Sequence, residues 1–436
     1  MIRRSLVCLG ESFPLTRTAR ARRPSPIRAL QPLLATKGMI SLGGGMPNAT
    51  TFPISRIELK MKDGSGVVLD EDETKAALQY SASRGLPCLV SHLKSLQAKV
   101  HGLDFKRGKR DVIVTNGSQD GLAKAFEMLL EPRVDTLLVE SPTYSGSLAF
   151  LGPASIHLQG VQTDEHGMIP SDLRRVLESW EVSNPKRKKP RVLYTIPTGS
   201  NPSGGSLSLA RKNEIYQVAV EHNLIILEDD PYYFLDFEGS SSPDGPARCP
   251  SLLSIDERAG GARVLRFDSF SKLLSAGIRV GFATGPSKLI ESIELHTQAS
   301  MLHASGVSQA VVSKIFDHLG GVDGFLTHVD DVTSFYRERR DALVASVERH
   351  LSEFVEFESP KAGMFLWMKL KGVKDSNDLI MNKAVERKVL MVPGASFIPT
   401  NNDEPNISSF VRASYSTASV EEMDEACQRL RDLLKK

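Results

Sequence analysis

The sequence predicts an α/β protein whose main domain holds a largely parallel sheet, together with a smaller α+β domain. Its 436 residues exceed what one small core organises, so two domains are expected. From about residue 111, short and continuously apolar runs alternate with amphipathic helical windows, which indicates parallel strands covered by helices on both faces. After about residue 325 the pattern changes to one long helical window, then strands and a closing helix.

The strands of the main domain are predicted from short β-branched and aliphatic runs. The run DVIVTNG (111–117) precedes a helical window at 118–132, which starts at Ser118 and stops near Pro132. A second helical window covers 207–223. The further strand candidates are 135–140, 190–196, 223–230, 263–269 and 278–284.

The smaller domain is predicted from a long helical window at 328–351, a strand at 362–370 and a helix at 420–436. We expect the residues before about position 60 to join it. The predicted organisation is therefore a tail, a substrate segment that forms part of the small domain, a large domain and a small C-terminal domain, at residues 1–23, 24–60, 61–325 and 326–436.

Composition excludes several classes of protein. A formal net charge of +2 favours neither nucleic acid nor an anionic membrane as a partner, and no apolar run reaches the ~18–20 residues of a membrane span. The ten histidines include no HExxH motif and no His/Cys cluster, so no metal is expected. The four cysteines form no CxxC pair, which indicates a reducing compartment without a disulfide framework, namely Cys8, Cys88, Cys249 and Cys427.

The first 23 residues differ from the rest of the chain. They hold six arginines and a single acid, Glu11, with scattered serine and threonine. This composition is typical of a mitochondrial transit peptide, which predicts the mitochondrial matrix as the location. A basic tail that stays in the cytoplasm is the alternative.

The stretch FDSFSKLLSAGIRVGFATG (267–285) places Lys272 between two serines, Ser269 and Ser271, with Arg279 seven residues on. Two hydroxyls and a guanidinium suit a phosphate dianion, and a nearby amine suits a covalent bond to an aldehyde. Ser118 and Gln119, which open a helix after a strand, offer backbone N–H groups to the same kind of group. Taken alone, this motif is equally well explained as an ordinary helix N-cap that binds no ligand.

Polar residues follow three other predicted strands. Asp229 in LEDDPYY could keep a pyridine nitrogen protonated, and Tyr232 could donate to the phenolic oxygen of that ring. Asn201 in IPTGSNPSGG is a second donor, and Tyr144 in SPTYSG has an aromatic face that could stack. Each motif alone is also explained by strand-end acids or by a turn.

In this order, GSQ, PTY, NPSG, EDDPYY, SFSK…GIRVG and VRAS resemble the class I/II aminotransferases of the pyridoxal-phosphate (PLP) fold type I. The chain is most similar to the kynurenine/2-aminoadipate aminotransferases and the fungal aromatic aminotransferases related to them, from about Pro24 to the C-terminus. The resemblance implies a large domain with a mostly parallel seven-stranded sheet and a small domain drawn from both chain ends.

The resemblance also implies a role for each motif residue. Lys272 would be the catalytic lysine that forms a Schiff base with pyridoxal 5'-phosphate. Arg412 in SSFVRASYS would grip the substrate carboxylate. Ser118, Gln119, Ser269, Ser271 and Arg279 would hold the phosphate, while Asp229, Asn201, Tyr232 and Tyr144 would hold the ring.

Three further residues are assigned by the same resemblance. Arg28 in RRPSPIRAL and Gly45 in SLGGGMPN would contact substrate, as would Asn201. Tyr80 in LQYS would reach the cofactor phosphate and the substrate of the neighbouring chain in a homodimer whose active site lies at the interface. Met46 stands where the family commonly has leucine, and NPSGG replaces the more usual NPTG.

The implied activity is a ping-pong Schiff-base transfer of the amino group of 2-aminoadipate, kynurenine or an aromatic amino acid to 2-oxoglutarate. The products would be a 2-oxo acid and glutamate. A lyase of the same fold, acting on an amino acid with the same Lys272, Asp229 and Arg412, is the alternative. The glycines of SLGGG lack the GxGxxG spacing of a dinucleotide site, and the roughly 40 residues before them leave no room for the DNA-binding domain of a transcription regulator.

Overall fold

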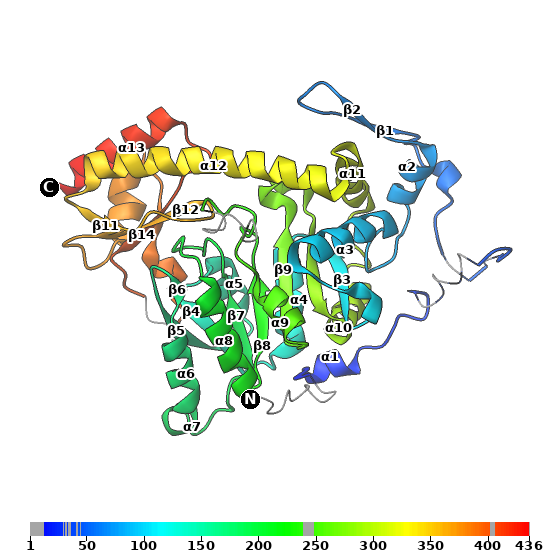
Figure 1. Ribbon diagram of the computed structural model, residues 1–436, viewed down its shortest axis with the longest axis horizontal. Helices are drawn as coiled ribbons and strands as arrows, with labels where there is room; N and C mark the ends of the chain where they lie inside the picture. Colours follow the sequence, from blue (N-terminus) through cyan, green and yellow to red (C-terminus); the bar gives the residue numbers. More distant parts are fainter. Residues whose placement is uncertain are drawn as a thin grey trace. The chain divides into compact units, whose positions relative to one another are not determined.

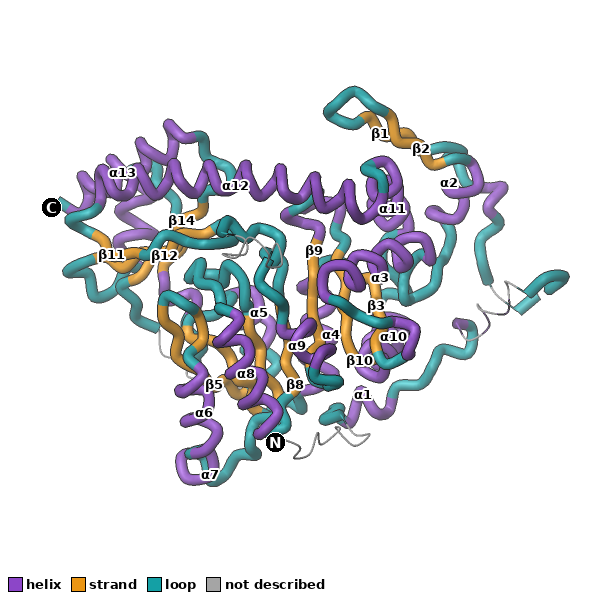
Figure 2. The backbone as a smooth tube through the Cα atoms, in the orientation of Figure 1, coloured by secondary structure: helices purple, strands orange, loops and turns teal. Residues whose placement is uncertain are grey.

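The computed structural model describes residues 13–28, 30, 33, 36–40, 42–43, 45–238, 248–401 and 406–435. Most of the predicted transit segment, residues 1–12, lies outside the described residues. The described chain forms two compact units (Figures 1 and 2). Unit 1 covers Met1–Glu131 and Leu253–His328, and unit 2 covers Pro132–Leu252 and Val329–Lys436. The domain boundaries expected from the sequence stay a prediction.

Three strands form the sheet of unit 1, in the order β3 (Arg110–Thr115), β10 (Gly281–Pro286) and β9 (Val264–Ser269). The central strand β10 is antiparallel to both neighbours, and Gly281 lies opposite Thr115 on one side and Ser269 on the other. The end of β3, the end of β9 and the start of β10 therefore meet at one point. This register brings the GSQ and SFSK motifs together.

Helices cover the sheet of unit 1. The helix α4 (Ser118–Leu129) packs on β9 and β10, α10 (Ser287–Ser300) on β3 and β10, and α3 (Pro87–His101) on β3. An aromatic cluster fills the core, in which Phe270 makes edge-to-face contacts with Phe316 and Phe325 at ring distances of 5.9 and 5.8 Å. The remaining elements are β1 (Ile57–Lys60), β2 (Gly66–Leu69), α2 (Glu71–Leu78), α11 (Gly306–His318) and the short helices at Ala49–Thr51 and Phe105–Arg107.

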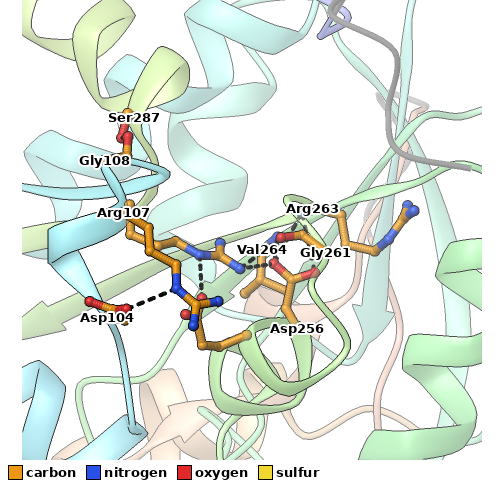
Figure 3. Close-up of polar contacts among 10 residues, drawn as sticks. Asp104, Arg107, Gly108, Asp256, Gly261, Arg263, Val264 and Ser287 are labelled. Atoms are coloured by element: carbon orange, nitrogen blue, oxygen red, sulfur yellow. Dashed lines mark hydrogen bonds and ion pairs between the residues drawn. The ribbon is translucent and has the colours of Figure 1, made fainter. Parts of the chain in front are cut away.

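A buried ion pair fixes the start of β9 in unit 1 (Figure 3). The carboxylate of Asp256, in α9 (Leu252–Arg258), accepts hydrogen bonds from Arg110 at 2.7 Å and from the backbone N–H groups of Arg263 and Val264. Arg110 also pairs with Glu257 at 3.0 Å. Because both carboxylate oxygens of Asp256 accept hydrogen bonds, the buried charge is tolerated and holds α9 against β3 and β9.

The arginine-rich segment that precedes Pro24 is partly folded in unit 1. The short helix α1 (Arg17–Ala21) docks on α4, since Thr16 donates its backbone N–H to Met128 and its hydroxyl to Glu127, at 2.8 and 2.9 Å. Ala19 is buried at this contact. Residues 16–21 thus belong to the folded core of unit 1.

We expect Ala19→Arg to lower the stability of unit 1 by roughly 1–3 kcal/mol, because a long cation must replace a methyl group in a packed contact. The matched control is Thr18→Arg, which places the same side chain at an exposed position of the same helix. Thermal unfolding measures the difference. Equal melting temperatures for the two variants would show that α1 is not docked.

Five strands form the main sheet of unit 2, in the order β8 (Ile225–Asp229), β7 (Val192–Thr195), β4 (Thr136–Ser141), β5 (His157–Asp164) and β6 (Gly167–Met168). The first four run parallel, and β6 forms an antiparallel hairpin with β5. The carboxyl-terminal ends of β4, β7 and β8, which carry the predicted polar residues, therefore lie at the same edge of this sheet. The two-residue β6 is a strand beyond those expected from the sequence.

Helices and a second sheet complete unit 2. The helix α6 (Pro170–Glu178) packs on β5 and on α8 (Leu209–Glu221). The second sheet is antiparallel, in the order β11 (Val355–Phe357), β12 (Phe365–Leu370), β14 (Phe410–Ser414) and β13 (Val392–Pro393). The other helices are α5 (Ser145–Leu151), α7 (Trp180–Ser183), α12 (Gly321–Leu351), which begins in unit 1, α13 (Val420–Leu434) and short turns at Leu379–Ala384 and Gly394–Phe397. Throughout the described part of the chain, no helix combines the length and apolarity that crossing a membrane requires.

Candidate active site

Unit 1 gathers the predicted phosphate-binding residues around Gly281. The Ser269 hydroxyl accepts from the backbone N–H of Ser271 at 3.2 Å and donates to its hydroxyl at 3.0 Å. Arg279 donates to the same Ser271 hydroxyl at 3.3 Å. Lys272 is half-buried and closes the short helix Phe270–Lys272 that follows β9, directly after Ser271 in the chain.

The start of α4 completes this group. Its N-cap residue, Gly117, has a φ of 81° and no side chain with which to cap the helix. The Arg279 guanidinium lies against Gly117, where a Cβ would come within 2.3 Å of Nη2. Arg279 donates only to neutral oxygens and pairs with no carboxylate of the described residues. The Arg279 guanidinium is therefore a cation that no carboxylate of the described residues compensates, which suits an anion.

Gly281 is the residue on which this packing depends. A Cβ there would lie 2.7 Å from the backbone of Gly117 and Ser118 and 2.8 Å from the carbonyl oxygen of Asp268. We expect Gly281→Ala to displace the start of α4 and to weaken retention of a phosphate-bearing ligand by at least about tenfold. Gly277→Ala is the control, because nothing lies within 4 Å of its Cβ. Ligand content after dialysis measures the effect, and equal retention by both variants would contradict it.

Unit 2 gathers the predicted ring-binding residues at the ends of β7 and β8. Asp229, the last residue of β8, accepts a hydrogen bond of 2.8 Å from the Tyr194 hydroxyl of β7. Burial, followed by the charge of Asp229, raises the pKa of Tyr194 well above its usual value, so this phenol stays a donor. Tyr144 precedes α5 and lies over Gly146, where a Cβ would come within 2.4 Å of its ring.

The buried phenol of Tyr232 lies close to Asp229, and the half-buried cation of Arg412 lies close to that phenol. Burial, with Asp229 next, raises the pKa of Tyr232, while the charge of Arg412 and a hydrogen bond with Asn201 oppose the rise. Arg412 donates to the Asn201 side-chain oxygen at 2.7 Å and lies over the rings of Phe365 and Phe397, at 4.2 and 4.9 Å. Burial lowers its pKa, and its Nε has no hydrogen-bond partner among the described residues. No carboxylate in that part of the chain neutralises it.

The structure brings together only some of the predicted substrate-binding residues, namely Arg28 and Tyr80. In unit 1, Arg28 donates to the carbonyl oxygen of Ser81 at 2.7 Å and lies 5.8 Å from the ring centre of Tyr80. Tyr80 is 46% exposed and contacts His303 edge to face. Gly45 is exposed, and no atom lies within 4 Å of a Cβ at this position.

A comparison with models of protein families identifies the family to which this chain belongs. The model of the family described as "Aminotransferase class I and II" matches residues 38–430. The chain belongs to this aminotransferase family. The membership confirms the predicted enzyme class, a PLP-dependent aminotransferase.

Known aminotransferases resemble this chain both in sequence and in fold. The chain is 45% identical to the mitochondrial kynurenine/alpha-aminoadipate aminotransferase of Bos taurus, over 97% of this chain and 98% of the relative. It also matches the crystal structure of the aromatic aminotransferase Aro9 from C. albicans, with a TM-score of 0.85, 28% identity and 97% of each chain covered. The kynurenine aminotransferase of Pyrococcus horikoshii, solved in complex with PMP, KYN as substrates and KYA as products, matches with a TM-score of 0.72, 27% identity and 96% of each chain covered.

These matches confirm the predicted fold, PLP fold type I, and the predicted resemblance to the kynurenine/2-aminoadipate and fungal aromatic aminotransferases. All three relatives are named as aminotransferases, which favours the transaminase reading over the lyase alternative.

The aminotransferase has two buried groups near these residues that the sequence did not single out. Tyr194 supports Asp229, and Glu140, near the end of β4, lies completely buried. Tyr194 stands opposite Leu227, two residues before Asp229, and only this pairing of β7 with β8 reveals its role. Glu140 directly precedes the SPTYSG motif, but its partners come from 55 and 60 residues away.

Burial raises the pKa of Glu140 to about 7 from an ordinary value of 4.5, and hydrogen bonds from Thr195, Ile196 and Ser200 partly oppose the rise. A raised pKa means that the folded protein holds this proton more tightly than the unfolded chain. The cost of ionised Glu140 is therefore absent below about pH 4.5 and fully present above about pH 7.

A glutamine side chain at position 140 cannot ionise. The unfolding free energy of the Glu140→Gln variant, relative to that of the parent protein, should therefore rise by roughly 2–3 kcal/mol between about pH 5 and about pH 8. Urea unfolding at both pH values measures this change. Glu178→Gln, at an exposed position of α6, is the control and should show no such trend. A pH-independent difference for Glu140→Gln would contradict the raised pKa.

Proposed function

We propose that this aminotransferase binds pyridoxal 5'-phosphate and moves the amino group of 2-aminoadipate, kynurenine or aromatic amino acids to 2-oxoglutarate. The observation that carries this proposal is Arg412, a half-buried cation that lies over two aromatic rings and, among the described residues, pairs with a neutral amide and with no carboxylate. Such an arginine lacks a counter-ion, and an amino-acid or 2-oxo-acid carboxylate supplies one in a bidentate fork.

The residues present fit the cofactor. The uncompensated Arg279, the two serine hydroxyls and the uncapped start of α4 form a cradle for a phosphate dianion, and Gly117 keeps it open. Asp229, which Tyr194 holds by a hydrogen bond, is a carboxylate suited to a protonated pyridine nitrogen. When bound, pyridoxal phosphate supplies an electron sink for the bond that breaks at the substrate Cα.

Residues of this chain would bind the substrate carboxylate, transfer the proton and hold the cofactor ring. We assign carboxylate binding to Arg412, with Asn201 fixing the plane of its guanidinium. Lys272, the amine of the SFSK motif, would take the proton from the substrate Cα and pass it to the cofactor, and would return a proton to Cα when a 2-oxo acid is converted to its amino acid. Asn201 and Tyr232 donate to the ring oxygen, Tyr144 stacks on the ring, and Arg28 and Gly45 contact the substrate side chain.

An amino-donor panel tests the function. Purified holoenzyme is mixed with 2-oxoglutarate and, in separate reactions, 2-aminoadipate, kynurenine, phenylalanine and tyrosine, and glutamate is measured. We expect glutamate formation that requires both the donor and 2-oxoglutarate, with a matching change in cofactor absorbance. Consumption of a donor without 2-oxoglutarate would instead identify a lyase.

We further propose a homodimer in which Tyr80 serves the cofactor and substrate of the partner subunit. The exposed face of Tyr80 supports this role. Mixing Tyr80→Ala protein with Lys272→Ala protein tests it, because a mixed dimer would place both defects in one site and leave the other intact. Recovery of activity on mixing is expected, and no recovery, with mixed dimers shown to form, would place Tyr80 in its own subunit's site.

We also propose that the protein is imported into mitochondria, as the name of its bovine relative says of that protein. Because α1 docks on α4, the leader would end before Thr16. Mass spectrometry of the N-terminus of the organelle protein tests this location. A mature N-terminus beyond Arg28 would contradict the substrate role of Arg28, and cytoplasmic protein that begins at Met1 would contradict import.

A further inference from the structure

Glu140 is the common acceptor of a cluster of hydrogen bonds whose donors, among the described residues, lie on one strand end and the loop that follows it. The Thr195 hydroxyl donates to one carboxyl oxygen at 2.6 Å, and the Ser200 hydroxyl donates to the other at 3.2 Å. The backbone N–H of Ile196 donates as well. All three donors come from the end of β7 and the segment that follows it.

That segment, residues 196–207, carries Asn201, and we call it the asparagine loop. It closes on itself through three backbone hydrogen bonds, in which Ser200 donates to Gly205, Gly204 to Ser200 and Leu207 to Pro197. Gly199 presses against the backbone of Ala362 and Gly363, where a Cβ would come within 2.8 Å. A loop closed and packed in this way moves as one body, so its anchors decide where Asn201 lies.

Two carboxylates anchor the asparagine loop to the sheet. Asp230 accepts from Thr198 at 3.2 Å, and Glu140 accepts from Ser200, the residue directly before Asn201. An apolar residue at position 140 would be the simpler occupant of a fully buried site, since an acid is costly there. The donors that offset this cost all belong to the loop and to the strand end that leads into it.

We infer that Glu140 is a positioning residue that fixes the asparagine loop and, through Ser200 and Asn201, aims Arg412 at the substrate carboxylate. The chain of contacts is continuous: Glu140 to Ser200 at 3.2 Å, then along the backbone to Asn201, whose amide oxygen accepts from Arg412 at 2.7 Å. Arg412 has no other hydrogen-bond partner in the described chain. This inference rests on the proposed role of Arg412 as the carboxylate-binding residue.

Steady-state kinetics of holoenzyme with Glu140→Gln and Ser200→Ala provide the test. We expect the KM values for the amino donor and for 2-oxoglutarate to rise about tenfold in both variants, while kcat changes less than about threefold. Binding of glutarate, a dicarboxylate that carries no amino or oxo group, is followed by cofactor absorbance and should weaken by the same factor. Glu178→Gln is the control and keeps the parent values.

A double variant separates positioning from general support of the fold. In an Arg412→Lys background, Glu140→Gln should raise KM little further, because the group on which it acts is already gone. Additive effects, or a fall in kcat and melting temperature without a change in KM, would overturn the inference. Failure of the parent holoenzyme to bind glutarate or to form glutamate would instead contradict the proposed function.

Discussion

Lys272→Ala is expected to lower turnover by more than about 10⁴-fold while the protein stays folded. Two functions disappear with this amine: the covalent link to an aldehyde, and the transfer of a proton at the substrate Cα. The fold should survive, because Lys272 is half-buried at the end of a short helix and the core beneath it is formed by Phe270 and Leu273.

Glutamate formation in the donor panel measures the loss, and Lys288→Ala, at an exposed position of α10, serves as the control. Borohydride reduction followed by peptide mass spectrometry gives an independent readout: a pyridoxyl group should be fixed on residue 272 of the parent and be absent from the variant. Near-normal turnover by Lys272→Ala, or a labelled lysine elsewhere, would remove the central assignment.

Arg412→Lys is expected to lower kcat/KM by roughly 30- to 1000-fold for both the amino donor and 2-oxoglutarate. The planar guanidinium lies over Phe365 and donates to Asn201, and its Nε has no hydrogen-bond partner among the described residues. A lysine keeps the charge but loses the fork and the stacking, which corresponds to about 2–4 kcal/mol of transition-state binding.

An amine without a carboxylate is the matched probe for this variant. Phenethylamine, the amine of phenylalanine, should be a poor substrate of the parent and should be affected little by Arg412→Lys. An equal loss for phenylalanine and for phenethylamine would show that Arg412 supports the site as a whole and does not recognise the carboxylate.

The regular elements of this protein could be predicted well where the pattern was strong. The apolar runs at 111–117 and 263–269 correspond to β3 and β9, and the window at 118–132 corresponds to α4. The strand β5 was missed because its sequence, HLQGVQTD, has only two buried positions and no clear alternation. Tertiary pairing with β4 makes it a strand.

In the candidate site, too, some residues could be predicted from the sequence and others could not. Motif order along the chain pointed to Lys272, Asp229 and Arg412. Lys272 and Asp229 each end an element, whereas Arg412 lies inside β14 and was found from its VRAS motif. Glu140 and Tyr194 were invisible, since a buried polar side chain has meaning only through its partner. The partner of Glu140 lies on another strand, and so does that of Tyr194.

The sequence by itself determined the fold class, the enzyme family and the chemical type of each motif residue, because these depend on residue type and local spacing. Only the tertiary structure decided that Gly281 brings two motifs together, that Arg412 is stacked without a paired carboxylate among the described residues, and that Glu140 anchors the loop of Asn201. The physical reason is that burial, strand register and charge compensation arise between residues far apart in the chain.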